Sequence, residues 1–339
     1  MQKAELSGIV EQVAALVVEH YVFPDVATRV SRTLRTGLAE GRYPAEEQAL
    51  AAALTADLQS VNADKHLRLL HHAQPLPERH GQDEADLATM TVWAEQTCAG
   101  IASLQRLPAN VGYLDLQPVL FPTAVCGAAI GAAMSLLAAT EALIIDLRAC
   151  LGGEPTMVSF LCGYLLGPEP VELTGLYERT TDRIRQHWTL PYVPGRRFGA
   201  SKPVYVLTSA TTFSGGEQLA FDLQQHGRAT LVGNRTRGGA HAREGFKVHP
   251  HLEATIPVAQ AVHPHTGGNW EGTGLTPDVE VPAQHAQHTA YRLALEHIIA
   301  QNGAMAAEAH QTRQDLPSQI ITATPPQPDH TGTKTEGPA

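Results

Sequence analysis

The stretch from Thr208 to Glu217 (TSATTFSGGE) places a serine where an expected strand turns into an expected helix. A helix N-terminus has unpaired amide hydrogens and positive potential, which would stabilise an oxyanion beside Ser214, and Gly215 would let a substrate approach the backbone closely. Ser-x-x-Glu before an apolar run is also a capping box. This stretch alone therefore leaves both roles for Ser214 open, although the absence of a Gly-x-Ser-x-Gly elbow disfavours an α/β-hydrolase.

A second strand-to-helix turn lies at Asp146 to Gly153 (DLRACLGG). Its paired glycines, Gly152 and Gly153, could expose an amide as an oxyanion donor, or could only permit positive φ at a tight connection. Neither turn ends as a P-loop does, and no glycine run matches Gly-x-Gly-x-x-Gly. The sequence therefore predicts no nucleotide cofactor.

Histidines are numerous, 17 in all, and two pairs have the spacing His-Pro-His, at His249 and His251 and at His263 and His265. Histidines two apart on a strand point to the same side, which zinc could use. The prolines, and the absence of a Cys, Asp or Glu cluster nearby in the sequence, favour loop histidines, so no metal is predicted. His66 differs because it ends a helical region, from which it could reach the rest of the fold. A surface histidine is the alternative.

The elements that would position these residues fall into two groups. Apolar residues at three- and four-residue spacing predict helices over 4–20, 26–40 and 46–61, which indicate a helical domain over 1–75, followed by a polar linker over 76–95. The α/β core is expected over 96–305, with parallel buried strands. Its predicted strands are 111–116, 142–147, 203–207 and 229–232, and its predicted helices are 123–140, 153–166, 214–225 and 284–302. Residues 306–339 are expected to be a disordered tail.

Composition excludes several classes of function. Lys and Arg number 24 and Asp and Glu 34, a net charge of −10 without a basic block, so nucleic acid is not an expected partner. The four cysteines form no CxxC pair and the first 25 residues lack the pattern of a signal peptide, which predicts a cytoplasmic protein. The most apolar window, Ala124 to Ala139, is too short for a membrane span, so no membrane insertion is expected.

Taken together, these segments resemble the S41 family of serine peptidases, which contains the tail-specific processing peptidases, the tricorn core protease and the interphotoreceptor retinoid-binding protein repeats. The resemblance covers about residues 5 to 300 and is closest to bacterial members akin to the retinoid-binding repeats. It rests on segments that follow the family's order: Asn62 to Leu67 (NADKHL), Leu107 to Leu116, Leu143 to Gly153, Tyr177 to Thr181, Thr208 to Glu217, Gly238 to His241 (GGAH) and Asn269 to Gly274 (NWEGTG).

The resemblance implies a crotonase/ClpP-like superhelical α/β core with an N-terminal helical domain. It implies Ser214 as the nucleophile, His66 as the base and Glu271 as the carboxylate of the same constellation. The amide of Gly215 and one in the Gly152–Gly153 turn match the family's oxyanion hole. This agrees with chemistry, since a serine needs a neighbouring base to lose its proton and the base needs an orienting acceptor.

The sequence departs from the family's patterns at four places. Where Ser/Lys members have a lysine, residues 234–239 read NRTRGG, and arginine cannot serve as a base, which leaves His66. Lys65 stands where the tricorn type has a serine, and Cys150 where the family usually shows asparagine. The segment between His66 and Pro108 is too short for a PDZ domain, so specificity must come from the cleft or the helical domain.

The leading hypothesis is a serine hydrolase, most simply a peptidase that cleaves short or unfolded peptides without a cofactor. One alternative is a non-catalytic binder of an apolar small molecule or peptide. Another is a serine-dependent acyl transferase or esterase in a biosynthetic pathway. The expected partner is therefore a peptide or small-molecule substrate, and a homo-oligomer remains open.

Overall fold

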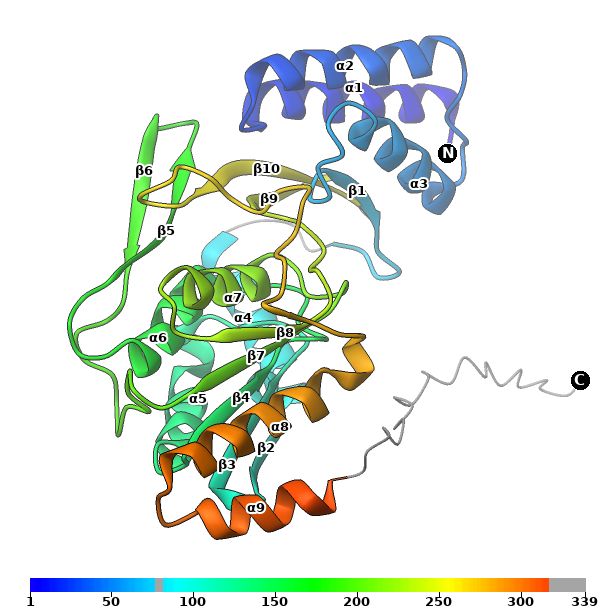
Figure 1. Cartoon of the computed structure of the whole chain (residues 1–339). Helices are drawn as coiled ribbons and strands as arrows, with labels where there is room; N and C mark the ends of the chain where they lie inside the picture. The colour runs from blue at the N-terminus through cyan, green and yellow to red at the C-terminus, as the bar shows by residue number, and fades with distance from the viewer. Residues whose placement is uncertain (77–81, 317–339) are drawn as a thin grey trace, which may run out of the picture.

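The computed structural model describes residues 1–76 and 82–316. Figure 1 shows an N-terminal group of helices above one sheet, and a second sheet below it with helices on both faces. The chain is thus a mixed α/β protein with an N-terminal helical region, as the alternation of elements predicts.

The first group consists of α1 (Lys3–His20), α2 (Pro24–Ala39) and α3 (Glu47–Gln59). The apolar spacing that predicts these helices also marks their buried sides, for example Ile9, Val13 and Val17 in α1. Pro24 occupies the first turn of α2, and the Glu46 side chain accepts the free amides at the start of α3. Local signals therefore account for all three helices.

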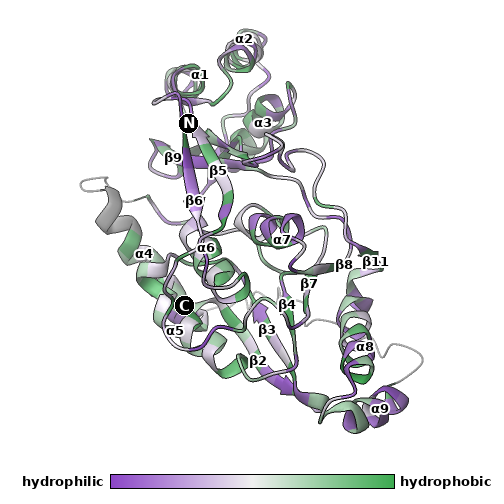
Figure 2. Cartoon of the chain, turned by 60° about the vertical axis from the view of Figure 1, so that its left-hand side comes forward, coloured by the Kyte–Doolittle hydropathy of each residue, from purple (hydrophilic) through white to green (hydrophobic). Residues whose placement is uncertain are grey.

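These helices pack on an antiparallel sheet whose strands come from distant parts of the chain. Its order is β1 (Arg68–His71), β10 (Leu252–Val262), β5 (Glu172–Glu178) and β6 (Arg183–Trp188), and β9 (His241–His249) also pairs with β10. Leu252, Ala254 and Ile256 of β10 share one buried cluster with the helices. Figure 2 shows β6 in the hydrophilic colour, in agreement with its exposed side chains.

The larger sheet carries the order β11 (Val279–Glu280), β8 (Thr230–Gly233), β7 (Val204–Thr208), β4 (Ala142–Asp146), β3 (Val111–Leu116) and β2 (Ile101–Leu107). All its pairs are parallel except β2 with β3, and β4 and β7 are buried along their whole length, as predicted for parallel strands between helices. One apolar cluster joins this sheet to α5 (Thr123–Leu137), α6 (Pro155–Leu165) and α7 (Gly215–Gln225), and another joins its other face to α8 (Ala283–Gln301) and α9 (Ala306–Asp315). Two short 3-10 helices, η1 (Cys98–Gly100) and η2 (Pro108–Asn110), flank β2.

The structure differs from the expected linker and tail. Residues 82–96 form α4, whose Trp93 ring meets Phe121 edge-on at 5.2 Å and whose Ala94 is buried, so this part of the expected linker is a packed helix. Residues 306–315 form α9, where the Glu308 carboxylate accepts the Ala109 amide at 2.9 Å. Both segments are too polar for their helices to be recognised from apolar spacing. The rest of the expected linker and tail, 77–81 and 317–339, lies outside the described residues. Within 1–76 and 82–316, no helix has the length and apolar character that crossing a membrane requires.

Candidate active site

Ser214 lies between β7 and α7, at the N-cap of the helix and half-buried. Its φ is +50° and its ψ −122°, a conformation that residues with a side chain rarely adopt. Backbone strain of this kind typically costs about 1–3 kcal/mol and is concentrated at functional sites. The strain therefore favours a chemical role for Ser214 beyond capping the helix.

The Glu217 carboxylate, one turn into α7, holds this region together. It accepts the Ser214 amide at 3.0 Å, the Thr236 hydroxyl at 2.5 Å, and the amides of Gly238 and Gly239 at 2.7 and 2.9 Å. Burial raises the pKa of Glu217, while these hydrogen bonds act in the opposite direction. Glu217 thus provides the capping-box carboxylate and also fixes the loop that leads into β9.

The two glycine turns lie against each other beside Ser214. A Cβ atom on Gly152 would lie 3.0 Å from the Ser214 Cβ, and one on Gly215 would lie 2.3 Å from the Gly153 carbonyl oxygen. In the described part of the chain, the amides of Gly153 and Gly215 make no hydrogen bond. Cys150, a neutral thiol whose pKa burial raises to about 12, supports the turn by donating to the Gly152 carbonyl at 3.4 Å. These unpaired donors can stabilise an oxyanion.

His66 is buried on the loop before β1 and reaches this site through Phe213. The two rings stack with their centroids 4.4 Å apart, and Phe213 directly precedes Ser214. No hydrogen bond joins His66 to Ser214 among the described residues, and the His66 Nδ1 is buried without a partner. Burial lowers the pKa of His66 to about 3, so its ring is neutral at physiological pH.

Glu271 does not orient His66 in this structure. Its Oε2 accepts the Ala240 amide at 2.6 Å and lies 3.6 Å from the Nδ1 of His241, whereas its Oε1 is buried without a partner. A carboxylate partner would raise the pKa of His66, and Glu271 does not act as one here. Desolvation dominates instead.

His241 stands between two carboxylates. Its Nδ1 donates to the Asp64 Oδ2 at 2.7 Å, and the other Asp64 oxygen accepts the backbone amide of His66 at 3.0 Å. Burial opposes the charge on both partners, yet their hydrogen bond and mutual attraction raise the pKa of His241 and lower that of Asp64. Burial raises the pKa of Glu271. The Asp64–His241 ion pair thus anchors the loop that carries His66 to the start of β9.

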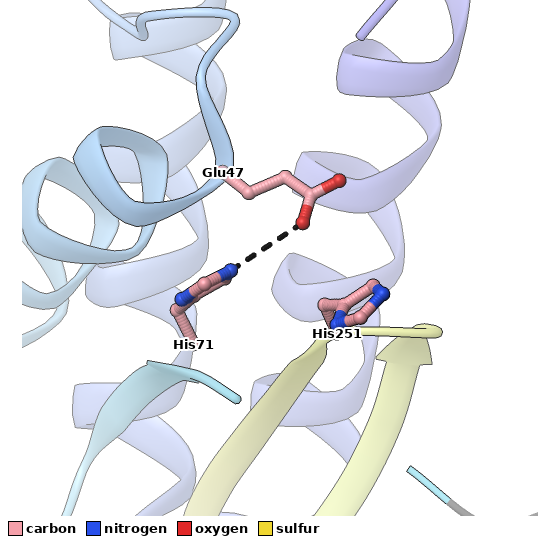
Figure 3. Close-up of side chains that lie close together, drawn as sticks. All are labelled: Glu47, His71 and His251. Carbon is pink, nitrogen blue, oxygen red and sulfur yellow. Dashed lines mark ion pairs between the residues drawn. The ribbon is translucent and has the colours of Figure 1, made fainter. Parts of the chain in front are cut away.

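Among residues 1–76 and 82–316, two groups of side chains have donor atoms close enough together for a metal ion. One is the set Asp64, His241 and Glu271 just described. The other joins Glu47 of α3, His71 of β1 and His251 of the turn between β9 and β10, with 3.5 Å between the Glu47 Oε2 and the His71 Nε2 (Figure 3).

In the second group, His251 already uses its Nδ1 to donate to the His72 carbonyl at 2.9 Å, so only its Nε2 could act as a ligand. Acyl transfer by a serine nucleophile needs no metal ion. His251 lies in the turn between β9 and β10, as expected for a loop histidine, and the fold brings Glu47 beside it from a distant part of the sequence.

Sequence reasoning assigned no role to Asp64, His241 or Phe213. Asp64 and His241 do lie in the motifs NADKHL and GGAH that carry the family resemblance. Only the pairing of distant loops shows that the two motifs meet.

The structure resembles solved structures that are distant in sequence. A putative peptidase from Parabacteroides merdae is 15% identical, with a TM-score of 0.59, over 86% of this chain and 96% of that one. A photosystem II D1 C-terminal processing protease is 16% identical, with a TM-score of 0.50, over 83% and 94%. The tricorn protease is 12% identical, with a TM-score of 0.51, over 92% of this chain but 37% of that one. At these identities the likeness shows a common fold.

Two family models match the sequence. The model of the N-terminal domain of peptidase family S41 in eukaryotic IRBP matches residues 2–104, which hold the helical region and β1. The model of peptidase family S41 itself matches residues 110–281, half of the chain, which hold the larger sheet except for β2, together with Ser214 and both glycine turns. The chain therefore belongs to peptidase family S41 and is a serine-type peptidase.

Proposed function

We propose that this peptidase cleaves short or unfolded peptides through an acyl-enzyme on Ser214, with His66 as the general base. The Ser214 oxygen attacks the carbonyl carbon of the scissile bond while His66 takes the hydroxyl proton. The oxyanion accepts hydrogen bonds from the amide of Gly215 and one amide of the Gly152–Gly153 turn. The protonated His66 then gives its proton to the leaving amine, and water releases the acyl group by the same steps.

One observation carries the proposal: a strained serine at a helix N-terminus, surrounded by unpaired backbone amides. A serine that served only as a cap would not need two glycine turns packed against it. The neutral state of His66 supports its role, because a base must be unprotonated to accept the serine proton.

Ser214 and His66 are not hydrogen-bonded in this structure, so the proposal requires this bond to form when substrate binds. Catalytic hydrogen bonds often tighten only in the complex with substrate. The His66 ring stacks on Phe213, the residue before Ser214, and the proposal requires substrate binding to join the His66 and Ser214 side chains. Glu271 then acts indirectly, through the loop that contains Ala240 and through His241.

Covalent labelling tests the nucleophile. We expect a fluorophosphonate to add once to the wild-type chain, as intact mass would show, and not to Ser214→Ala. Ser209→Ala is the matched control, because Ser209 lies in the same segment but its hydroxyl already donates to the Arg148 carbonyl at 2.6 Å. A wild type that stays unlabelled while a control hydrolase is labelled would favour the non-catalytic binder.

Kinetics of two neighbouring variants test the base. We expect His66→Ala to lower kcat/KM about as much as Ser214→Ala and as much as the double variant, because base and nucleophile act as a unit. Lys65→Ala is the comparison, since the Lys65 ammonium donates to the Arg237 carbonyl and is not the proposed base. If Lys65→Ala abolished turnover while His66→Ala kept most of it, the base would be the lysine.

We also infer that the protein works in a reducing compartment such as the cytoplasm. All four cysteines are free thiols, and Cys126, Cys150 and Cys162 are buried. Oxidising compartments favour paired cysteines. Intact-mass measurement with a thiol reagent, on denatured protein taken directly from the cell, should count four reactive thiols.

A further inference from the structure

A groove of about 790 Å³ lies beside the proposed active site, between α3 and β1. Its floor and walls include small and apolar side chains of both elements, and three of its lining residues are Lys65, Arg68 and Arg237. The Arg237 guanidinium lies 4.5 Å from the centre of the Phe213 ring, the ring that stacks on His66. One end of the groove thus borders the base and the residue before the nucleophile.

The charges in this groove are unbalanced. No acidic residue is among those that line it, although the whole chain has 34 acidic against 24 basic residues. None of Lys65, Arg68 and Arg237 has a carboxylate within ion-pair distance in the described part of the chain. Their hydrogen bonds instead use backbone carbonyls: Lys65 donates to Arg237, and the Arg68 Nε donates to Lys65 at 2.5 Å.

The cations also repel one another. Burial lowers the pKa of Arg68, and the positive charges of Arg237 and of the exposed Arg243 lower it further, while the Asp64 carboxylate acts more weakly in the opposite direction. Holding like charges together without a direct ion-pair partner destabilises the folded protein, and an anion in the groove would relieve the repulsion. The arrangement is therefore typical of a binding site for negative charge.

The edge of the sheet gives a second constraint on the ligand. β1 pairs only with β10, so its other edge faces α3. There, the Thr55 hydroxyl accepts the Leu69 amide at 3.0 Å and donates to the Leu69 carbonyl at 3.1 Å, and the Gln59 amide donates to the Leu67 carbonyl at 3.2 Å. A peptide cannot add to this edge as a further strand. Recognition in the groove must use side chains.

We propose that this groove binds side-chain carboxylates of the substrate, so that the peptidase prefers peptides with Asp or Glu near the bond that it cuts. The inference rests on the proposed function only in placing the groove next to Ser214 and His66. Arg68 and Arg237 would be the main partners, because a guanidinium can bind a carboxylate through two parallel hydrogen bonds. Lys65 would add a third positive charge.

Binding to the full-length Ser214→Ala chain tests the proposal without turnover. The probes are fluorescein-labelled peptides rich in Asp and Glu and their counterparts with Asn and Gln, each with a free and with an amidated C-terminus. We expect fluorescence anisotropy to show at least tenfold tighter binding of the acidic peptides. The preference should shrink as salt rises, because screening weakens attraction between charges in contact with solvent.

Variants locate the preference. We expect Arg68→Gln and Arg237→Gln each to reduce it about fivefold or more, Arg68→Lys to keep most of it, and Arg106→Gln to leave it unchanged. Arg106 is the matched control because it is an exposed arginine on β2, in the other sheet. Thermal melts followed by circular dichroism show which variants fold, and Arg68→Lys keeps the test usable if Arg68→Gln does not.

Three results would overturn the proposal: equal affinity for acidic and amide peptides, a preference that survives in both Gln variants, or a preference that follows the free C-terminus and not the side chains. The last would assign the groove to the chain end of the substrate. Fluorophosphonate labelling of the wild type, run in parallel, separates this test from that of the nucleophile. An unlabelled chain that still selects acidic peptides would keep the groove and remove the catalytic proposal.

Discussion

Protonation of His66 should destabilise the folded protein, and the effect is large enough to measure. The ring is buried against Phe213, its Nδ1 has no partner, and burial lowers its pKa from the ordinary 6.5 to about 3. At about 1.4 kcal/mol for each pKa unit, placing a proton on this ring costs on the order of 5 kcal/mol more in the folded than in the unfolded chain.

The sign follows from the two pKa values. Between pH 6.5 and about 3, His66 carries a proton in the unfolded chain but not in the folded one. The unfolded state then binds one more proton, so the contribution of His66 is complete above pH 6.5 and is lost as the pH falls, by about 1.4 kcal/mol per pH unit. At pH 5 its loss should amount to about 2 kcal/mol.

Urea unfolding of the wild type and of His66→Asn, at pH 7.5, 6 and 5, measures this contribution. Asparagine cannot be protonated, whereas the other titrating groups are common to both chains, so the difference between the two stabilities isolates His66. We expect the wild type to lose about 2 kcal/mol relative to the variant between pH 7.5 and 5. The kcat/KM of the wild type should likewise show no ionisation of His66 between pH 5 and 8, since the base stays neutral there. A stability difference that does not change with pH, or a limb of the rate profile near pH 6.5, would refute the reasoning.

The remaining predictions concern the surroundings of the site. Glu217→Ala leaves four hydrogen-bond donors without an acceptor, each at a cost of about 1–3 kcal/mol. Urea unfolding should therefore show a loss of at least about 3 kcal/mol in the free energy of unfolding. A loss below about 1 kcal/mol would mean that water replaces the carboxylate. In Gly239→Ala, the new methyl group would lie 2.1 Å from the Phe213 Cε2 and 2.7 Å from the His66 Cε1. Because this contact would displace the stacked rings, kcat/KM should fall more than tenfold. Unchanged kinetics would show that the stacked pair can move freely. His241→Ala removes the partner of the buried Asp64 carboxylate and of the half-buried Glu271 carboxylate, and it should cost about 3–5 kcal/mol in a thermal or urea melt, a cost that a merely exposed ion pair would not produce. Dialysis against EDTA should leave peptide hydrolysis unchanged, and a loss of activity that zinc restores would instead give the histidine and carboxylate groups a catalytic part.

Local patterns in the sequence were sufficient for the elements that depend on nearby residues. The buried strands β3, β4, β7 and β8 and the helices between them show clear apolar runs or spacing, so the α/β core was predicted with small errors at the ends. Ser214 and the glycine turns were found for the same reason, since each motif is continuous in the chain. β5 and β6 were missed because they alternate weakly, and because β5, on which β6 pairs, joins the sheet through β10, which is far away in the sequence.

Contacts between distant segments could not be predicted from residue types alone. The resemblance placed Glu271 and His66 in one constellation. In the structure, the Glu271 carboxylate instead accepts the Ala240 amide and lies beside His241. The pKa of His66 has the same origin, since its low value comes from burial by segments that are remote in sequence. The grouping of His71 with Glu47 likewise needs α3 to lie on β1.

The position of the long strand β10 in the sequence affects when the site can form during synthesis. β10 pairs with β1, the strand that follows the His66 loop, and with β9, the strand that follows the loop bound by Glu217. It nevertheless lies late in the sequence and ends at Val262. During synthesis at about 5–20 residues per second, Ser214 leaves the ribosome well before β10 does. Under the proposed mechanism the serine then has no fixed base, because the strand that holds the histidine loop in place is still missing. Under this mechanism, the order of the segments delays peptidase activity until β10 has been synthesised.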